Sequence, residues 1–430
     1  MKKLILFCAI ALTGTFSNAQ LSWTVQNSAF PNASTGINSI RIVDNNTAWA
    51  LGYDGSVAAG NYQTFTKTSN AGSTWTSGDI LLGDPTLLIS DISAISSTTA
   101  WTIATYDVGG TGGGVWKTTD GGSTWNKQTT ATFSSPASFG NVVHFFDANN
   151  GFCQGDPTGT LFEIYTTTNG GTNWTKLTSG SVAPAQSGEA GYVHSRAVAG
   201  DNAWFGTSKG RLFKTANKGA TWTVVSTPIS DFGSAVSSGT FTLKDANNAW
   251  ILASTGVVYS TTNGGTTWTA GSTLPQTNSI TYVPGTTATL IAVGNGTGST
   301  ISTNGGTTWT PIEASNPFVS VAALNGSTIY GGSFNANTFT GGVFKLSQLL
   351  ATQENKINSG IVIYPNPTAD FITIKTDEKI KLVTIFDIMG RKMEAQLAGN
   401  VIDVRDLEAG TYIINIETTN GRSTEKFIKK

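Results

Sequence analysis

Short apolar runs that follow polar turns recur along the first 350 residues of the chain. Each run begins with small polar residues and continues into aromatic or aliphatic positions. The seven runs are centred on Trp49, Trp101, Phe152, Trp204, Trp250, Leu290 and Ile329. Short apolar runs bounded by turn-forming residues are typical of buried β-strands. The pattern therefore predicts an all-β region built from one repeated unit.

A motif of eight residues follows six of these runs, as in TSNAGSTW or TTNGGTTW. Asn or Asp beside Gly is typical of a tight turn with positive φ, and its side chain can bond the turn's own backbone. The Trp then begins the next strand and can bury its ring between sheets. We therefore predict a structural role for twelve motif residues, namely Asn70, Trp75, Asp120, Trp125, Asn169, Trp174, Asn217, Trp222, Asn263, Trp268, Asn304 and Trp309.

This motif is that of the Asp-box, or BNR repeat, and the region resembles the Asp-box β-propellers. Successive motif Trp residues lie 50, 49, 48, 46 and 41 residues apart. The seventh run lacks a box and leads only to Gly341–Ser347, where the array stops. The strand missing from that unit is present at the N-terminal end, where Ser22–Gln26 resembles the strands that follow the boxes. We therefore predict a seven-bladed propeller closed by an N-terminal strand.

A finer resemblance rests on the stretch between Gly155-Asp156-Pro157 and Phe162-Glu163-Ile164, and on Ser187–Gly191 after the third box. These segments resemble the photosystem II stability/assembly factor-like branch of the Asp-box propellers. The resemblance covers roughly residues 21–349. It implies the fold and no single activity, because propellers carry unrelated functions.

The N-terminal residues 1–19 are predicted to be a signal peptide. Lys2 and Lys3 precede the apolar run Leu4–Leu12, and Ser17-Asn18-Ala19 places small residues before the expected cleavage point. Cleavage there leaves Cys153 as the one remaining cysteine, which excludes an intramolecular disulfide in the mature chain. No later segment is long and apolar enough for a transmembrane helix, so we expect an exported protein.

Composition changes near residue 350 and marks a second domain. Residues 21–349 contain 12 Lys/Arg and 15 Asp/Glu, whereas the 80 residues from Ala351 contain 11 of each. All 12 Trp precede the change. We predict domains at residues 20–349 and 361–430, joined by a polar linker at residues 350–360. The second domain has short strands and polar turns, which predict a small β-sandwich.

The second domain resembles the type A C-terminal sorting domain of the type IX secretion system. The resemblance rests on an ordered set of motifs, from YPNP through IMGR to AGTY, followed by a basic end. It implies Sec export, passage across the outer membrane through the type IX machinery, and removal of the domain. The motif residues are Tyr364, Pro365, Asn366, Pro367, Gly390, Arg391, Gly410 and Tyr412.

The best candidate surface is the long connection Thr178–Ser195 and its flanks. Loops on a rigid scaffold carry function more often than the scaffold itself. We predict a binding site there from Asp156, Glu189, Tyr192, His194 and Arg196. If the protein is a glycoside hydrolase, Asp156 and Glu189 are the candidate acid and base.

Other chemistry has less support in the sequence. The propeller region has three Arg and no complete sialidase motif, and the two cooperating propellers of xyloglucanase-type hydrolases are absent. His144 and His194 lack short metal-ligand spacing, so we predict no metal and no cofactor. The net charge of −1 argues against nucleic-acid binding. We expect a monomeric, secreted or outer-membrane-surface binding module for a protein or glycan, with a hydrolase and an assembly factor as alternatives.

Overall fold

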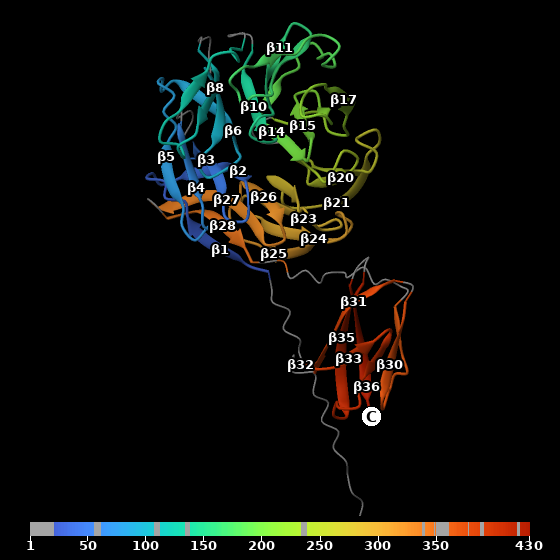
Figure 1. The fold of residues 1–430 in the computed structure, drawn as a ribbon. Helices are drawn as coiled ribbons and strands as arrows, with labels where there is room; N and C mark the ends of the chain where they lie inside the picture. The colour runs from blue at the N-terminus through green and yellow to red at the C-terminus, as the bar shows by residue number, and fades with distance from the viewer. Residues whose placement is uncertain are drawn as a thin grey trace, which may run out of the picture. The chain divides into compact units, whose positions relative to one another are not determined.

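The computed structural model describes residues 21–55, 62–106, 112–133, 138–233, 239–337, 340–347, 349, 361–376, 378–387, 391–418 and 422–430. The predicted signal peptide and linker lie outside these residues. The chain divides into two compact units, Met1–Leu349 and Leu350–Lys430. Every regular element in the described residues is a β-strand (Figure 1). Among those residues, no helix is long and apolar enough to cross a membrane.

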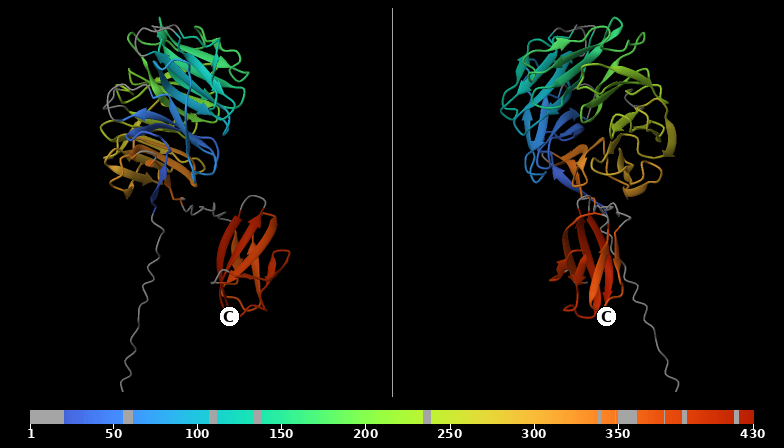
Figure 2. Two further views of the ribbon diagram at one scale, coloured as in Figure 1. Left: turned by 90° about the vertical axis from the view of Figure 1, so that its left-hand side faces the viewer. Right: turned by 45° about the vertical axis from the view of Figure 1, so that its right-hand side comes forward.

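The first unit is a ring of seven four-stranded antiparallel blades around a central channel (Figures 1 and 2), and one residue pair, Gly36 with Phe334, joins the first and seventh blades into a single eight-stranded sheet. Six blades are continuous in sequence, with the first strand innermost. Their strands are β2 (Thr35–Ile42), β3 (Ala48–Asp54), β4 (Thr64–Thr68) and β5 (Thr76–Asp79); β6 (Leu87–Ala94), β7 (Ala100–Tyr106), β8 (Gly114–Thr118) and β9 (Asn126–Gln128); β10 (Gly140–Phe145), β11 (Gly151–Thr158), β12 (Leu161–Thr167) and β13 (Thr175–Lys176); β14 (Gly191–Ala199), β15 (Asn202–Thr207), β16 (Arg211–Thr215) and β17 (Thr223–Ser226); β18 (Thr240–Leu243), β19 (Ala249–Leu252), β20 (Val257–Thr261) and β21 (Thr269–Thr273); β22 (Ser279–Tyr282), β23 (Leu290–Gly294), β24 (Gly298–Ser302) and β25 (Thr310–Glu313).

The seventh blade joins the two ends of the propeller sequence. It contains β26 (Ser320–Asn325), β27 (Thr328–Asn337) and β28 (Thr340–Leu346), and its fourth strand is β1 (Trp23–Asn27). β1 runs antiparallel to β28, with Trp23 opposite Leu346. The predicted seven-bladed, all-β fold and its closure by an N-terminal strand are therefore confirmed.

The six eight-residue motifs, or boxes, lie at one end of their blades, and we call this end of the propeller the box face. Each box connects the two turns at this end of its blade. In every box the Asn or Asp side-chain oxygen accepts a hydrogen bond from the backbone N–H four residues later, as from Thr74 to Asn70 at 2.9 Å. The residue after it donates its backbone N–H to the first turn of the same blade, as from Ala71 to Asn46 at 2.9 Å. Four box Trp rings are buried, and the other two, Trp268 and Trp309, are partly buried. These contacts explain why the motif repeats.

Lysines from four blades connect each of those blades to the next one. Each Lys lies in the third strand over an aromatic ring of its own blade and donates to a backbone carbonyl near the next box turn. Lys117, for example, lies 4.8 Å from the Trp101 ring centroid, and its Nζ is 3.0 Å from the Gly170 oxygen. The lysines are Lys67, Lys117, Lys214 and Lys345, the last of which bonds Ala71 across the ring closure.

The second unit is a sandwich of two four-stranded sheets (Figure 2). Its core contains Ile372, Ile385, Ile414 and Phe427, which are buried between the sheets. One sheet has the order β29-β30-β34-β33 and the other β32-β31-β35-β36. Their bounds are β29 (Val362–Tyr364), β30 (Phe371–Lys375), β31 (Ile380–Asp387), β32 (Lys392–Met393), β33 (Gln396–Ala398), β34 (Val401–Asp403), β35 (Gly410–Thr418) and β36 (Arg422–Lys429).

Several motif residues of this domain have visible structural contacts. Asn366 donates to the Lys426 carbonyl at 2.8 Å and accepts from the Ile428 N–H at 2.9 Å, so its side chain extends the pairing of β36. The Tyr412 hydroxyl donates to the Glu408 carbonyl at 2.9 Å. Arg391 forms an ion pair with Asp387 at 2.6 Å. Gly390 lies outside the described residues.

Candidate functional site

A polar cavity of about 550 Å³ lies along the central channel, between the inner strands β2, β14, β18, β22 and β26. Half of the residues that line it have hydroxyl, amide, guanidinium or imidazole side chains. Its charged lining side chains are Arg41 and Arg196, and this lining contains no Asp or Glu. The cavity is therefore suited to a polar ligand that extends into the channel.

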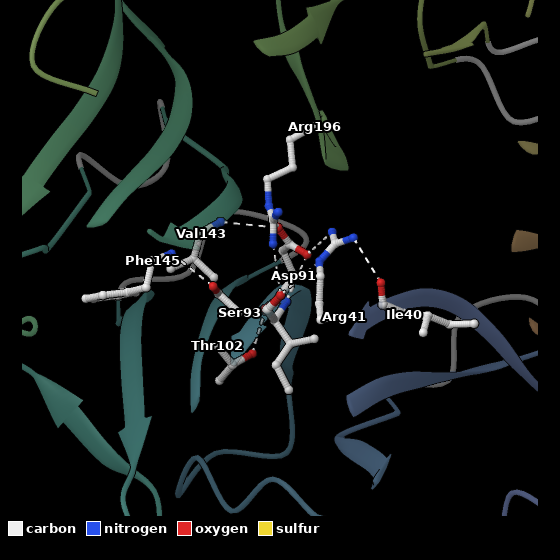
Figure 3. A network of polar contacts seen from close by, with 9 residues as sticks. Ile40, Arg41, Asp91, Ser93, Thr102, Val143, Phe145 and Arg196 are labelled. Atoms are coloured by element: carbon white, nitrogen blue, oxygen red, sulfur yellow. Dashed lines mark hydrogen bonds and ion pairs between the residues drawn. The ribbon is translucent and has the colours of Figure 1, made fainter. Parts of the chain in front are cut away.

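A buried carboxylate, Asp91, connects the inner strands of four blades beside this cavity (Figure 3). One oxygen accepts from Arg41 Nη2 of the first blade at 2.8 Å and the other from Arg196 Nε of the fourth at 2.8 Å. The backbone N–H groups of Ile92 and Val143 lie 2.9 and 3.4 Å from the same carboxylate. We call Arg41, Asp91 and Arg196 the charge hub.

The charge hub has one more positive than negative charge. Burial opposes ionisation of Asp91, but Arg196 and Arg41 together outweigh it and keep the pKa of Asp91 below its usual range. Burial is also the largest influence on the neighbouring imidazoles of His144 and His194, and it lowers the pKa of both. Both histidines are therefore neutral at neutral pH, and neither one changes the balance.

Three of the predicted site residues lie on the wall of this cavity, namely Tyr192, His194 and Arg196. They belong to a wide bulge in β14, where Gly191 pairs with Thr207 and the next pair is Arg196 with Phe205. His194 adopts φ +45°, a conformation that is sparsely populated for residues other than glycine. Backbone strain of this kind persists where surrounding contacts enforce it.

Asp156 and Glu189 lie in different surroundings. Asp156 accepts from the Gly191 N–H at 2.7 Å and from Asn141 Nδ2 at 2.9 Å, and burial raises its pKa. The Glu189 side chain is fully buried and forms an ion pair with Arg211. Neither carboxylate is among the residues that line the channel cavity.

Glu189 anchors the long connection to the fourth blade. Besides Arg211, its carboxylate accepts from the Thr207 hydroxyl at 2.5 Å and the Gln186 N–H at 2.8 Å. Burial alone would raise the pKa of Glu189, but its bonds with Arg211, Thr207 and Gln186 lower it overall. A carboxylate with this set of donors is placed to hold the connection between blades.

The earlier part of the connection is also held against the scaffold. The Trp222 N–H donates to the Ser181 carbonyl at 2.7 Å, and the Ala183 N–H donates to the Trp222 carbonyl at 3.0 Å. The Ala185 N–H donates to the Thr160 carbonyl at 2.8 Å. The predicted surface therefore has two parts. Residues 181–189 are bonded to neighbouring strands, whereas Tyr192–Ser195 form the bulge on the wall of the cavity.

Asp91 was not among the site residues predicted from the sequence. The only local signal was that Asp91 is the single charged residue of the strand Leu87–Ala94. The three arginines do not converge as a sialidase triad, because Arg211 is bound to Glu189 while Arg41 and Arg196 share Asp91. Across the described residues, no group of three or more His, Cys, Asp or Glu side chains could hold a metal ion.

Two families match separate parts of the chain. Residues 89–240 match the photosynthesis system II assembly factor YCF48 family, and residues 362–430 match the secretion system C-terminal sorting domain family. No curated protein matches the chain in sequence.

Solved structures of YCF48 propellers have the same fold. YCF48 from Cyanidioschyzon merolae is 17% identical, with a TM-score of 0.53 over 76% of this chain and 98% of that chain. A structure described as YCF48 bound to D1 peptide is 15% identical, with a TM-score of 0.51 over 77% and 97%. A GH74 xyloglucanase from Xanthomonas campestris is 12% identical over 81% of this chain and 75% of that chain, with a TM-score of 0.29. The chain therefore combines a YCF48-like β-propeller with a secretion system C-terminal sorting domain.

Proposed function

We propose that this protein is a secreted or cell-surface binding module, and that its ligand, a protein or glycan segment, occupies the central channel. The observation that carries the proposal is the 550 Å³ cavity with its polar wall and two arginines. A rigid ring of blades presents this wall without a need to order it on binding, which lowers the entropic cost of association. The D1 peptide bound to one YCF48 propeller is consistent with a fold that can bind a chain segment.

A glycoside hydrolase is the second candidate, and one observation favours it. The pKa of Asp156 is raised and that of Glu189 is lowered, which is the pattern expected for an acid and a base. Against it, the Glu189 side chain is fully buried and already bonded to Arg211, Thr207 and Gln186. A base must reach a water molecule beside the substrate, and these contacts leave Glu189 no route to one.

Export through the type IX system follows from the sorting domain at residues 362–430. The proposal includes Sec-dependent passage, followed by surface attachment or release of the propeller. Deletion of residues 361–430 in the native cell is expected to retain the propeller in the periplasm, as measured by fractionation and immunoblotting. Surface delivery of the truncated chain would contradict this part of the proposal.

The binding function is tested with purified residues 20–430 on glycan arrays, peptide arrays and a panel of polysaccharide hydrolysis assays. We expect binding without product release, unchanged by Asp156→Asn. This substitution keeps the side-chain oxygen that accepts from Gly191 and Asn141. Product release that disappears with Asp156→Asn or Glu189→Gln would instead establish the hydrolase. Binding to peptides alone, with no glycan bound, would identify the ligand as a protein segment.

A further inference from the structure

The guanidinium groups of the charge hub have unused hydrogen-bond donors. An arginine offers five N–H donors. Arg41 makes three hydrogen bonds, to Asp91 and to the carbonyls of Ile40 and Ile92. Arg196 makes two, to Asp91 and to the Ile92 carbonyl. Five of the ten N–H donors therefore have no acceptor among the described residues.

The charge hub also has one positive charge that no carboxylate in the hub balances. Two guanidinium groups share the one carboxylate of Asp91, and the two neighbouring imidazoles are neutral. The Arg196 side chain is 4% exposed, so bulk water screens its charge poorly. Arg41 is 21% exposed and lines the cavity, which makes it the more accessible of the two. An anion that binds beside Arg41 would balance the hub.

Two further polar groups on the strand of Arg41 have no hydrogen-bond partner in the part of the chain that the structure describes. Ser39 is 2% exposed and its hydroxyl makes no hydrogen bond to any described residue. The Asn38 amide oxygen is also buried and has no partner in the same set of residues. Both residues line the cavity with Arg41. Buried polar groups are nearly always hydrogen-bonded in native proteins, so unpaired groups in a cavity point to a missing partner. The missing partner must donate to Asn38 and exchange a hydrogen bond with Ser39.

We infer that the channel binds an acidic sugar, with its carboxylate on Arg41 and its hydroxyls on Asn38 and Ser39. A carboxylate matches the planar fork of a guanidinium and forms short, charge-assisted bonds with it. A uronic acid has this carboxylate and several hydroxyl donors on a single ring, which fits three neighbouring residues of β2. A peptide carboxylate has no comparable set of hydroxyls beside it. This inference rests on the proposed binding function and specifies its ligand.

The test is isothermal titration of residues 20–430 with sodium glucuronate, glucose and N-acetyl-aspartate at one ionic strength. We expect glucuronate to bind at least about tenfold more tightly than the other two, which corresponds to about 1.4 kcal/mol. Arg41→Gln is expected to weaken glucuronate binding by about tenfold or more, and Ser39→Ala by a smaller factor, since it removes one neutral hydrogen bond. Arg405→Gln, which alters an exposed Arg–Asp pair in the other domain, is the matched control and should change nothing.

Three outcomes of the titrations would contradict a uronic acid site at Arg41. Equal binding of glucose would overturn the carboxylate contact, and equal binding of N-acetyl-aspartate would overturn the sugar. Unchanged affinity in Arg41→Gln would overturn the site. If Arg41→Gln fails to fold, Arg41→Lys retains the charge without the fork and should still weaken binding. If glucuronate does not bind while the arrays show a neutral glycan or a peptide ligand, this inference fails and the proposed function stands.

Discussion

Replacement of Asp91 by Asn tests whether the charge hub holds the inner wall of the propeller together. The substitution keeps the size of the side chain and removes its charge. Two arginines would then face a neutral amide, and one side of that amide would present N–H groups to existing donors. The Asp91 side chain is fully buried, so solvent can compensate little. We expect a large loss of stability without a change in blade architecture.

The magnitude follows from the burial of the hub. Removal of one partner of a buried ion pair typically costs about 3–5 kcal/mol. Unfolding entropies near 2.1 cal/mol/K per residue give about 0.7 kcal/mol/K for a propeller of about 330 residues. A loss of about 4 kcal/mol therefore lowers the midpoint of thermal unfolding by about 6 °C.

The assay is differential scanning calorimetry of the Asp91→Asn variant beside a Lys218→Met control, which leaves the turn hydrogen bonds of Asp147 in place. Asp147 pairs with Lys218 at 2.8 Å, but both side chains are more than a third exposed. Pairs of this kind contribute about 0–1 kcal/mol, so the control should shift by less than about 2 °C. The double variant Asp91→Asn with Arg196→Met should lose less than the sum of the single losses, because it removes one unpaired buried charge.

A shift of less than 2 °C for Asp91→Asn would refute this reasoning. Additive effects in the double variant would show that Asp91 and Arg196 do not stabilise each other.

Three further predictions concern the lysines that connect neighbouring blades, the sorting domain and the stability of the propeller in acid. Lys117→Met should lower the unfolding midpoint of the propeller by a few degrees, since it removes a hydrogen bond to the Gly170 carbonyl and a cation–π contact with Trp101. Equal midpoints by calorimetry would show that Lys117 does not stabilise the contact between its two blades. Asn366→Ala should destabilise the sorting domain by about 1–3 kcal/mol, as measured by urea unfolding, since it removes two backbone contacts of β36. The pKa of Asp91 is lower in the folded than in the unfolded state, so its contribution is present above about pH 4 and is lost as the pH falls through the folded value. Acid titration of Asp91→Asn should therefore show a shallower loss of stability than the wild type.

The blade repeat was predictable because each blade needs the same turn and the same packed strand, and it forms them with the same residue types. A turn that needs positive φ selects Asn and Gly, and a strand packed between two sheets selects Trp. The predicted closing strand was accessible for a similar reason, since Trp23 begins β1 as the box Trp residues precede the other outer strands. Local constraints of this kind leave a periodic record in the sequence.

The charge hub corresponds to no periodic pattern in the sequence. Arg196 lies 105 residues from Asp91, and it reaches that carboxylate from the bulged β14 strand. The length of a bulge cannot be read from hydrophobic alternation, so the facing direction of Tyr192, His194 and Arg196 was not accessible beforehand. Glu189 was a reasonable catalytic candidate until its pairing with Arg211, 22 residues away, was visible.

The repeat was predictable and the charge hub was not, because the two lie in parts of the propeller with different roles. The box face carries the repeated turns, which hold each blade to itself and, through the lysines, to its neighbour. The inner strands are not needed for these contacts, and a single carboxylate connects four of them. A site built on contacts between blades has no counterpart in the repeat unit, so Arg41, Asp91 and Arg196 each come from a different blade and have no equivalent in the others. The departures from the repeat on the inner strands, such as Arg41, Asp91 and Arg196, are therefore the positions where function in this chain should be sought.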